Sequence, residues 1–277
     1  MTPRPTADVG VFGGSGFYEF LDDVQHAVID TPYGPPSAPV AIGGIDGVAV
    51  AFLARHGVKH ELPPHKVNWR ANAWAMREVG VRWLVGPCAV GSLRPDRHPG
   101  EMVVLDQLVD RTWGRGDTFF DGPVPVHVPF ADPYCPELGA PLIAAAADAG
   151  VVAHEGGTVV VIQGPRFSTR AESRWFRSQG WDVVNMTQYP EAFLARELGI
   201  CYAGLALVTD YDTGVEGVVA PEARHVAMES VTMDAVFAVL EANVERTRQV
   251  LRRAIPRIAA LPRQCACATL SPTVPES

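Results

Sequence analysis

The stretch Val9-Gly10-Val11-Phe12-Gly13-Gly14-Ser15-Gly16 decides the expected fold, because a short apolar run ends there in a cluster of glycines and a serine. Apolar residues bounded by glycine are typical of a buried strand that leads into a tight turn. Such a turn suits an anion, since backbone amides without a neighbouring Cβ atom can approach it closely. The stretch is neither a Walker loop nor a full dinucleotide fingerprint, and on its own a turn of this kind is more often structural.

Further apolar runs alternate along the chain with segments of helical spacing. The apolar runs are 48–53, 83–85, 102–105, 158–162, 183–184 and 202–208, and the helical segments are 67–79, 138–149, 169–179 and 190–198. This alternation predicts an α/β fold with a central mixed, largely parallel sheet flanked by helices. We expect a single domain over residues 1–261 and a flexible tail over 262–277, which is rich in proline, serine and threonine.

Composition narrows the class of protein. The chain of 277 residues is 47% hydrophobic and 19% charged, which is ordinary for a globular domain. Its net charge of −8 argues against nucleic-acid and anionic-membrane binding, and the absence of a long apolar run predicts a cytoplasmic protein. Five scattered cysteines favour free thiols over disulfides. Cys265-Ala266-Cys267 has the donors for a metal, but in a tail we expect an inert pair and no metal site.

The residues Arg55-His56-Gly57 directly follow the apolar run 48–53. The planar guanidinium of arginine suits phosphate, and a strand end faces the crevice in which parallel sheets bind ligands. A surface ion pair is the alternative. His60 and His65 lack partners at metal spacing, so we expect them to pack at the entry to a helix.

A second turn of small residues, Gly86-Pro87-Cys88-Ala89-Val90-Gly91-Ser92-Leu93, follows the next strand. Its backbone amides could reach a phosphate, although close packing of a strand on a helix explains such residues equally well. No signature pairs Cys88 with a base, so thiol catalysis is not expected. The section 107–136 reads as a long irregular loop, which predicts a functional or interfacial role, and it carries His127.

Two later strands also end in polar residues. Phe167 follows the run 158–162 and can stack on a planar base, while Thr169 and Glu172 have the spacing of a capping box. Thr187 precedes a helix that begins near Pro190, where a hydroxyl favours an anion.

Asp210 and Asp212 follow the last strand at positions i and i+2, so their side chains can point the same way. If both are desolvated, one carboxyl group takes up a proton and the pair offers one donor and one acceptor. This pattern matches the imidazole nitrogen and the exocyclic amine of adenine. A solvated acidic turn is the alternative.

Taken together, these motifs resemble the trimeric type of the purine nucleoside phosphorylase family and, within it, the S-methyl-5′-thioadenosine phosphorylases. The resemblance covers roughly residues 9–258. Its motifs are Gly13-Gly14-Ser15-Gly16, Asp30-Thr31-Pro32-Tyr33-Gly34, Ala54-Arg55-His56-Gly57, Gly91-Ser92-Leu93, Asp106-Gln107, Asp110-Arg111-Thr112, Gly164-Pro165-Arg166-Phe167, Ala171-Glu172, Asn185-Met186-Thr187, Pro190-Glu191 and Thr209-Asp210-Tyr211-Asp212.

The resemblance implies a phosphate site made by Ser15, Arg55, His56 and Thr187, completed by the backbone around Ala89. Phosphate is then a co-substrate, and no cofactor or metal is needed. The family carries threonine in eukaryotic members at the position of Cys88, so one hydroxyl donor is replaced here.

The resemblance also implies a nucleoside site. Asp210 and Asp212 face the purine as the catalytic pair, Phe167 stacks on the base, Met186 lies under the ribose, and His127 comes from the adjacent subunit of a homotrimer or dimer of trimers. Members that prefer 6-oxopurines tend to carry asparagine at the position of Asp210, so aspartate favours a 6-aminopurine.

Val236 and Phe237 are implied to line the pocket for the 5′ group, and an apolar pocket suits a methylthio group better than a hydroxyl. The implied reaction is phosphorolysis of 5′-methylthioadenosine to adenine and 5-methylthioribose 1-phosphate. The alternatives are a phosphorylase for inosine, guanosine, 5′-methylthioinosine or another 5′-deoxyadenosine, a hydrolase, and an inactive nucleotide-binding protein.

Overall fold

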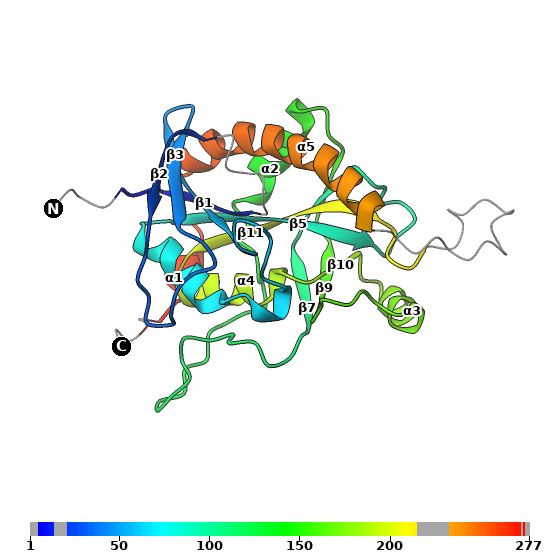
Figure 1. Cartoon of the computed structure of the whole chain (residues 1–277), viewed down its shortest axis with the longest axis horizontal. Coiled ribbons are helices and arrows are strands. Elements are labelled where there is room, and N and C mark those ends of the chain that lie inside the picture. The colour runs from blue at the N-terminus through cyan, green and yellow to red at the C-terminus, as the bar shows by residue number, and fades with distance from the viewer. Residues whose placement is uncertain (1–4, 14–20, 215–232, 273, 275–277) are drawn as a thin grey trace, which may run out of the picture.

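A mixed sheet forms the centre of the fold in the computed structural model. The structure describes residues 5–13, 21–214, 233–272 and 274, and over residues 233–243 it describes only the course of a helix. The strands are β1 (Val9–Gly13), β2 (Asp22–Ala27), β3 (Val40–Ile45), β4 (Val48–Ala54), β5 (Trp83–Ser92), β6 (Met102–Val104), β7 (Gln107–Arg111), β8 (Ala153–Glu155), β9 (Thr158–Ile162), β10 (Val183–Asn185) and β11 (Cys201–Asp210). Their order is β2-β3-β4-β1-β5-β10-β9-β7, with β11 between β5 and β6 and with β8 beyond β6 (Figure 1). The predicted α/β fold is confirmed.

The central strands β4, β1, β5 and β11 are parallel to one another. Every residue of β1 is buried, and in β11 only Asp210 is partly exposed. Such strands are apolar on both faces because helices cover both faces of the sheet. In register, Val11 lies between Phe52 of β4 and Val85 of β5. The carboxyl ends of these four strands therefore meet at one edge of the sheet, where parallel sheets bind their ligands.

The helices of the described ranges are α1 (Trp69–Glu78), α2 (Gly139–Asp148), α3 (Arg170–Ser178), α4 (Gln188–Glu197) and α5 (Met233–Ala259). They lie in two layers, except α3, which packs beside β9 and β10 (Figure 1). α2 and α5 pack on each other over one face of the sheet, and α1 and α4 cover the other (Figure 1). None of the helices in the described ranges has both the length and the apolar composition of a membrane span.

Some strands carry no apolar run in the sequence. The expected irregular section 107–136 begins with β7, which pairs with β9 and with no other strand of the described residues, so that prediction is wrong over Gln107–Arg111. All five residues of β7 are partly or fully exposed, which removes the apolar pattern that reveals a central strand. β2 is similarly exposed at the other end of the sheet.

The start of α3 agrees with its sequence signature. The Thr169 hydroxyl accepts the backbone N–H of Glu172 at 3.2 Å, and the Glu172 carboxylate accepts the backbone N–H of Thr169 at 2.7 Å. The predicted capping box is thereby confirmed, and it fixes the point at which the preceding loop with Phe167 ends.

The C-terminal segment differs from the expected tail in the part that the structure describes. Cys267, in the short 3-10 helix Ala266–Ala268, and Val274 are buried. The Gln264 N–H donates to the Glu137 carboxylate at 2.8 Å. This packing explains the difference, because contacts from remote segments fix residues whose own sequence has no periodic pattern.

Candidate active site

The acidic pair lies at the carboxyl end of β11. A register shift between Val208 and Asp210 interrupts the pairing with β5, and irregularities of this kind redirect a side chain. Both Asp210 oxygens are held at 2.7 Å, Oδ2 by the Thr209 hydroxyl and Oδ1 by the backbone N–H of Asp212. Gly91 of β5 lies against the pair, since a Cβ atom there would stand 3.0 Å from the Asp212 Cβ. Glycine at this position gives the two carboxyl groups their room.

The environment of both carboxyl groups favours the protonated form. Burial raises the pKa of Asp210, and burial together with the nearby charge of Asp210 raises the pKa of Asp212. The Ser173 and Ser168 hydroxyls lie close enough to lower the pKa of Asp212 in part. Nevertheless, Asp212 Oδ2 and both hydroxyl oxygens are buried without a hydrogen-bond partner of ordinary geometry among the described residues. Polar atoms left open in this way can receive a polar ligand.

Arg55 follows β4 and is held rigidly. Its Nε and Nη2 atoms donate to the two Glu191 carboxylate oxygens at 2.6 and 2.9 Å, and its Nη1 donates to the Pro87 carbonyl at 2.7 Å. The Tyr202 hydroxyl donates to Glu191 at 2.7 Å. The two charged side chains are only 4% and 3% exposed, so this is a buried ion pair. A guanidinium has five N–H groups, so two are left without a partner in the described part of the chain.

His56 is a neutral ring at physiological pH. Burial and the charge of Arg55 lower the pKa of His56 to about 4. Its Nδ1 lies 2.8 Å from the Leu62 carbonyl, and the ring stacks on His60 with centroids 4.6 Å apart. Because a carbonyl only accepts, Nδ1 carries the proton and Nε2 keeps a lone pair. His56 can thus accept a hydrogen bond from a protonated phosphate oxygen.

β5 opens toward the site at Ala89. This residue is exposed although its neighbours Cys88 and Val90 are buried, so the central strand has a hollow on one side here. The Cys88 thiol accepts the Asn185 and Gln188 side-chain amides at 3.2 and 3.4 Å. Burial raises the pKa of Cys88 to about 11, so the thiol stays protonated at neutral pH and is a poor nucleophile.

Thr187 stands before α4 with a free hydroxyl. Its Oγ1 is buried and has no hydrogen-bond partner among the described residues. On the neighbouring side, the Arg55 backbone N–H donates to the Gly13 carbonyl at 3.1 Å, which joins the end of β4 to the end of β1. The predicted phosphate ligand Ser15, two residues after Gly13, lies outside the described residues.

Met186 and Phe167 follow two adjacent strands, β10 and β9. The Met186 thioether packs against Gly164, where a Cβ atom would stand 2.5 Å from the sulfur. Phe167 is 55% exposed, so its ring is free to stack on a ligand among its described surroundings. Both stay predictions as nucleoside contacts.

The other predicted nucleoside residues are not brought to this edge by the described part of the chain. His127 is exposed on the loop between β7 and α2, a loop that extends away from the sheet (Figure 1). Val236 and Phe237 belong to α5, but their side chains lie outside the described residues.

Two charged residues support the site without having been predicted in it. Glu191 holds Arg55, as described above. The Arg115 guanidinium donates to the carbonyls of Met186 and Gln163 at 3.0 and 2.9 Å, and to that of Tyr189. Arg115 thereby ties the segments that follow β9 and β10 together. No local pattern distinguishes it from the exposed arginines nearby.

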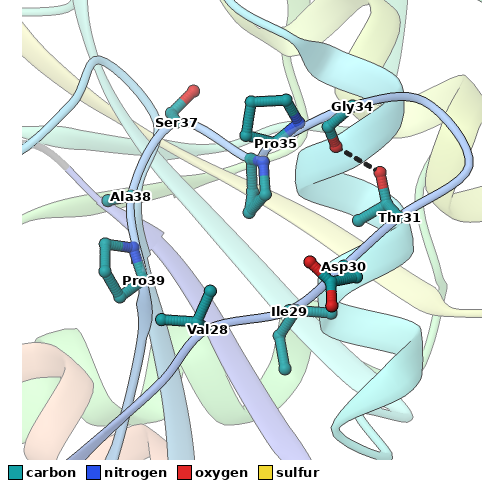
Figure 2. A pocket seen from close by; sticks show the side chains of 10 residues that line it. Val28, Ile29, Asp30, Thr31, Gly34, Pro35, Ser37, Ala38 and Pro39 are labelled. Carbon is teal, nitrogen blue, oxygen red and sulfur yellow. Dashed lines mark hydrogen bonds between the residues drawn. The ribbon is translucent and has the colours of Figure 1, made fainter.

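A separate hollow of about 440 Å³ lies against the loop between β2 and β3 (Figure 2). Its lining is Val28, Ile29, Asp30, Thr31, Gly34, Pro35, Pro36, Ser37, Ala38 and Pro39. The loop is closed by a hydrogen bond from the Thr31 hydroxyl to the Gly34 carbonyl at 2.5 Å. The lining contains none of the predicted site residues, so this hollow is not the proposed nucleoside site.

The model of the phosphorylase superfamily matches residues 8–256. The chain belongs to this superfamily. The phosphorylase class predicted from the sequence is therefore confirmed.

Named relatives of this phosphorylase fall mainly into one group. An S-methyl-5′-thioadenosine phosphorylase from Mycolicibacterium smegmatis is 64% identical over 75% of this chain and 78% of its own length. A purine nucleoside phosphorylase from Streptomyces coelicolor is 52% identical over 96% of this chain and 95% of its own. A solved methylthioadenosine phosphorylase from an antarctic soil metagenomic library is 41% identical, with a TM-score of 0.88 over 97% of this chain and 92% of that one.

Proposed function

We propose that this phosphorylase cleaves 5′-methylthioadenosine with phosphate to give adenine and 5-methylthioribose 1-phosphate. The observation that carries the proposal is the half-buried pair of Asp210 and Asp212, whose pKa values are both raised, at the same sheet edge as Arg55. The relatives named S-methyl-5′-thioadenosine phosphorylase support the same choice of substrate.

In this mechanism the protonated Asp210 carboxyl group donates to N7 of the purine as the bond between N9 and C1′ breaks. The electron pair of that bond goes to the base, and a phosphate oxygen bonds to C1′. The phosphate proton finally restores Asp210, so no proton is gained or lost overall. Asp212 accepts from the 6-amino side, and its unpartnered Oδ2 supports this assignment. General acid assistance of this kind contributes about 10²–10⁴-fold to a rate.

The phosphate is held by the two remaining N–H groups of Arg55, by His56 Nε2 and by the Thr187 hydroxyl. The ion pair with Glu191 fixes the guanidinium before phosphate arrives, which reduces the cost of ordering it. We further propose that Ser15 and the backbone at Ala89 complete the cradle. Phosphate is the only co-substrate, and no cofactor takes part.

We also propose a cytoplasmic homotrimer or dimer of trimers in which His127 enters the site of the adjacent subunit. The exposed position of His127 on a loop that leaves the sheet supports this arrangement (Figure 1). The free thiols support a reducing compartment. Val236 and Phe237 are proposed to line the pocket for the methylthio group.

Asp210→Asn tests the proposed acid, with Asp148→Asn as a matched control at an exposed ion pair with Arg257. We expect kcat for 5′-methylthioadenosine to fall by about 10²–10⁴-fold in the first variant and to stay within about twofold in the second. Circular dichroism establishes that both variants are folded. A folded Asp210→Asn enzyme with unchanged kcat would contradict the assignment.

The relative named purine nucleoside phosphorylase makes inosine or guanosine the competing substrates. The same variant separates these possibilities, because an amide at position 210 can donate to a 6-oxopurine. Under our proposal Asp210→Asn raises the ratio of inosine to 5′-methylthioadenosine turnover.

A further inference from the structure

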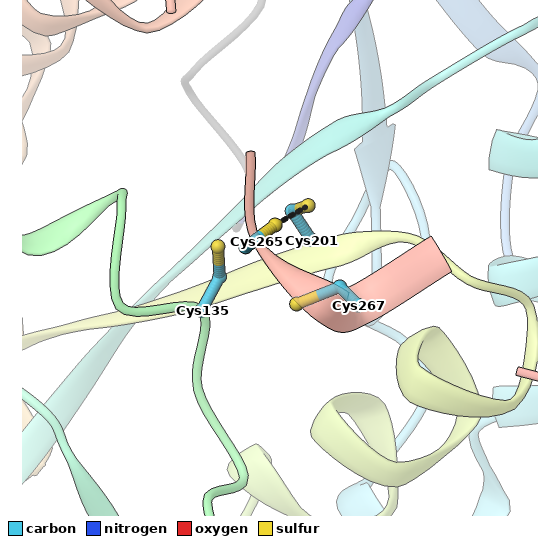
Figure 3. A group of neighbouring side chains, drawn as sticks. All are labelled: Cys135, Cys201, Cys265 and Cys267. Carbon is cyan, nitrogen blue, oxygen red and sulfur yellow. Dashed lines mark hydrogen bonds between the residues drawn. The ribbon is translucent and has the colours of Figure 1, made fainter. Parts of the chain in front are cut away.

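Four of the five cysteines come together at the opposite end of β11 from the acidic pair. The Sγ atoms of Cys135, Cys201, Cys265 and Cys267 all lie within 4.8 Å of one another (Figure 3). The sulfur atoms of Cys201 and Cys265 lie 3.3 Å apart. Three of the four side chains are buried. Within the described part of the chain, this is the only group of three or more potential metal ligands.

The four cysteines come from three separate parts of the chain. Cys135 lies on the loop before α2, Cys201 is the first residue of β11, and the other two belong to the C-terminal segment (Figure 3). The Cys135 backbone N–H donates to the Tyr202 carbonyl at 2.8 Å, which fixes the loop to the strand. A group assembled from segments so far apart in sequence is held by the fold itself.

The spacing of the sulfur atoms matches a tetrahedral metal site. With zinc–sulfur bonds of about 2.3 Å, the six sulfur–sulfur edges of a tetrahedron are each about 3.8 Å long. In the observed arrangement one sulfur–sulfur distance is 3.3 Å and none is above 4.8 Å, so small side-chain rotations bring the four sulfurs to this geometry. We propose that Cys135, Cys201, Cys265 and Cys267 bind one Zn²⁺ ion as four thiolates.

A pair of disulfides is the competing chemistry for four neighbouring thiols. Disulfide formation would draw the sulfurs together in two separate pairs at about 2.05 Å and would need an oxidant. In the structure all four are free thiols, and each one is within reach of the other three. A metal ion needs all four sulfur atoms around one point, whereas two disulfides need only two separate pairs.

Cationic side chains lie on the same side of the fold as the cluster. Binding of Zn²⁺ by four thiols releases four protons and leaves a centre with a charge of −2. The Arg196 guanidinium is buried and lies close enough to Cys267 to act on it electrostatically. Arg263, two residues before Cys265, donates through Nη2 to the Gly199 carbonyl, two residues before Cys201. The positive charge of such side chains partly offsets the negative charge of the centre.

Four thiolates fill the coordination sphere of Zn²⁺, so the ion has no position left for a substrate and acts structurally. β11 separates Cys201 from Asp210 by its whole length, which is about 30 Å at roughly 3.3 Å per residue. The metal would hold the C-terminal segment against the start of β11 and the loop before α2. It therefore contributes to the free energy of unfolding and leaves the chemistry at Asp210 to that site's own residues.

Metal analysis of the full-length protein tests the proposal directly. The protein is reduced under anaerobic conditions, incubated with Zn²⁺, freed of excess metal and analysed by mass spectrometry for bound elements. We expect one equivalent of zinc per chain. Replacement by Co²⁺ should give the intense visible bands of a tetrahedral site, together with sulfur-to-cobalt charge transfer in the near ultraviolet.

Variants assign the site to its residues. Cys265→Ser/Cys267→Ser should reduce bound zinc to about a tenth of an equivalent or less, because two ligands are lost. Cys88→Ser, which removes a buried thiol outside the cluster, should keep the full equivalent. If the double variant fails to fold, the cobalt spectrum of the unmodified protein still decides the ligand set.

Three results would overturn the proposal. The first is a fully reduced protein that takes up neither zinc nor cobalt. The second is a native protein without metal whose mass is lower by the four hydrogens that two disulfides lose. The third is stoichiometric iron in the protein as isolated, with no exchange for zinc under reducing conditions.

Discussion

Glu191→Gln tests how the phosphate-binding arginine is held. The change keeps the shape of the Glu191 side chain but removes its charge. It also replaces one of the two carboxylate oxygens that accept hydrogen bonds from Arg55 by an NH₂ group, which cannot accept them. Burial lowers the pKa of Arg55, but the ion pair with Glu191 outweighs burial and keeps that pKa raised. Without its partner the guanidinium remains charged and buried.

The size of the effect follows from the burial of the pair. Both side chains are less than 5% exposed, and two short hydrogen bonds join them. Removal of one partner from a buried pair costs about 3–5 kcal/mol of the free energy of unfolding. In a chain of this size that corresponds to a fall in Tm of roughly 6–20 °C. The KM for phosphate should also rise, because Arg55 loses its fixed orientation.

Thermal unfolding is followed by circular dichroism and calorimetry, with Asp8→Asn as the control. Asp8 forms a forked pair with Arg82 of the same type, but both side chains are about half exposed, so the control should lose less than about 1 kcal/mol. Equal losses in the two variants would refute the reasoning. So would a Glu191→Gln enzyme whose KM for phosphate equals that of the original.

Three further predictions concern single side chains. Thr187→Val should change the free energy of unfolding by no more than about 1 kcal/mol, because the buried Thr187 hydroxyl has no partner among the described residues. The same variant should raise the KM for phosphate about 10–100-fold in steady-state kinetics, because phosphate loses a hydrogen bond. Asp212 has a raised pKa in the folded state, so its stabilising effect is present at low pH and is lost as the pH rises above the ordinary value of 3.8. Asp212→Asn should therefore gain stability relative to the original enzyme as the pH rises, in denaturant titrations at acidic and alkaline pH; a constant difference would contradict this. Thr169→Ala should cost about 1 kcal/mol in the same titrations, through loss of the capping box, and no cost would contradict the cap.

Local features of the fold could be predicted from the sequence. The strand 158–162 and the capping box at Thr169 each depend on neighbours a few residues away, and the structure has both as expected. β7 could not be predicted, because a strand at the end of the sheet with exposed residues has no apolar run. β2 and β8 were missed for the same reason, since their residues are also partly or fully exposed. The central strands β4, β5 and β11 follow from the strong apolar patterns that burial on both faces imposes.

The parts of the site that could be predicted are those whose residues lie close together in the sequence. Asp210 and Asp212 lie only two positions apart at the end of one strand, so their pairing was visible without the structure. The link of Arg55 to Glu191 joins residues 136 positions apart, and no periodic pattern records it. The cysteine cluster was missed for the same reason, because Cys265 and Cys267 were assigned to a tail that in fact packs against β11.

The most direct test of the proposed reaction is base release from 5′-methylthioadenosine and from inosine, each with and without phosphate, followed by chromatography. The proposal predicts that adenine appears only when phosphate is present and that inosine reacts much more slowly. Hypoxanthine as the main product would contradict the assignment of Asp210 to a 6-aminopurine. Release without phosphate would mean a hydrolase, and binding without release would mean an inactive nucleotide-binding protein.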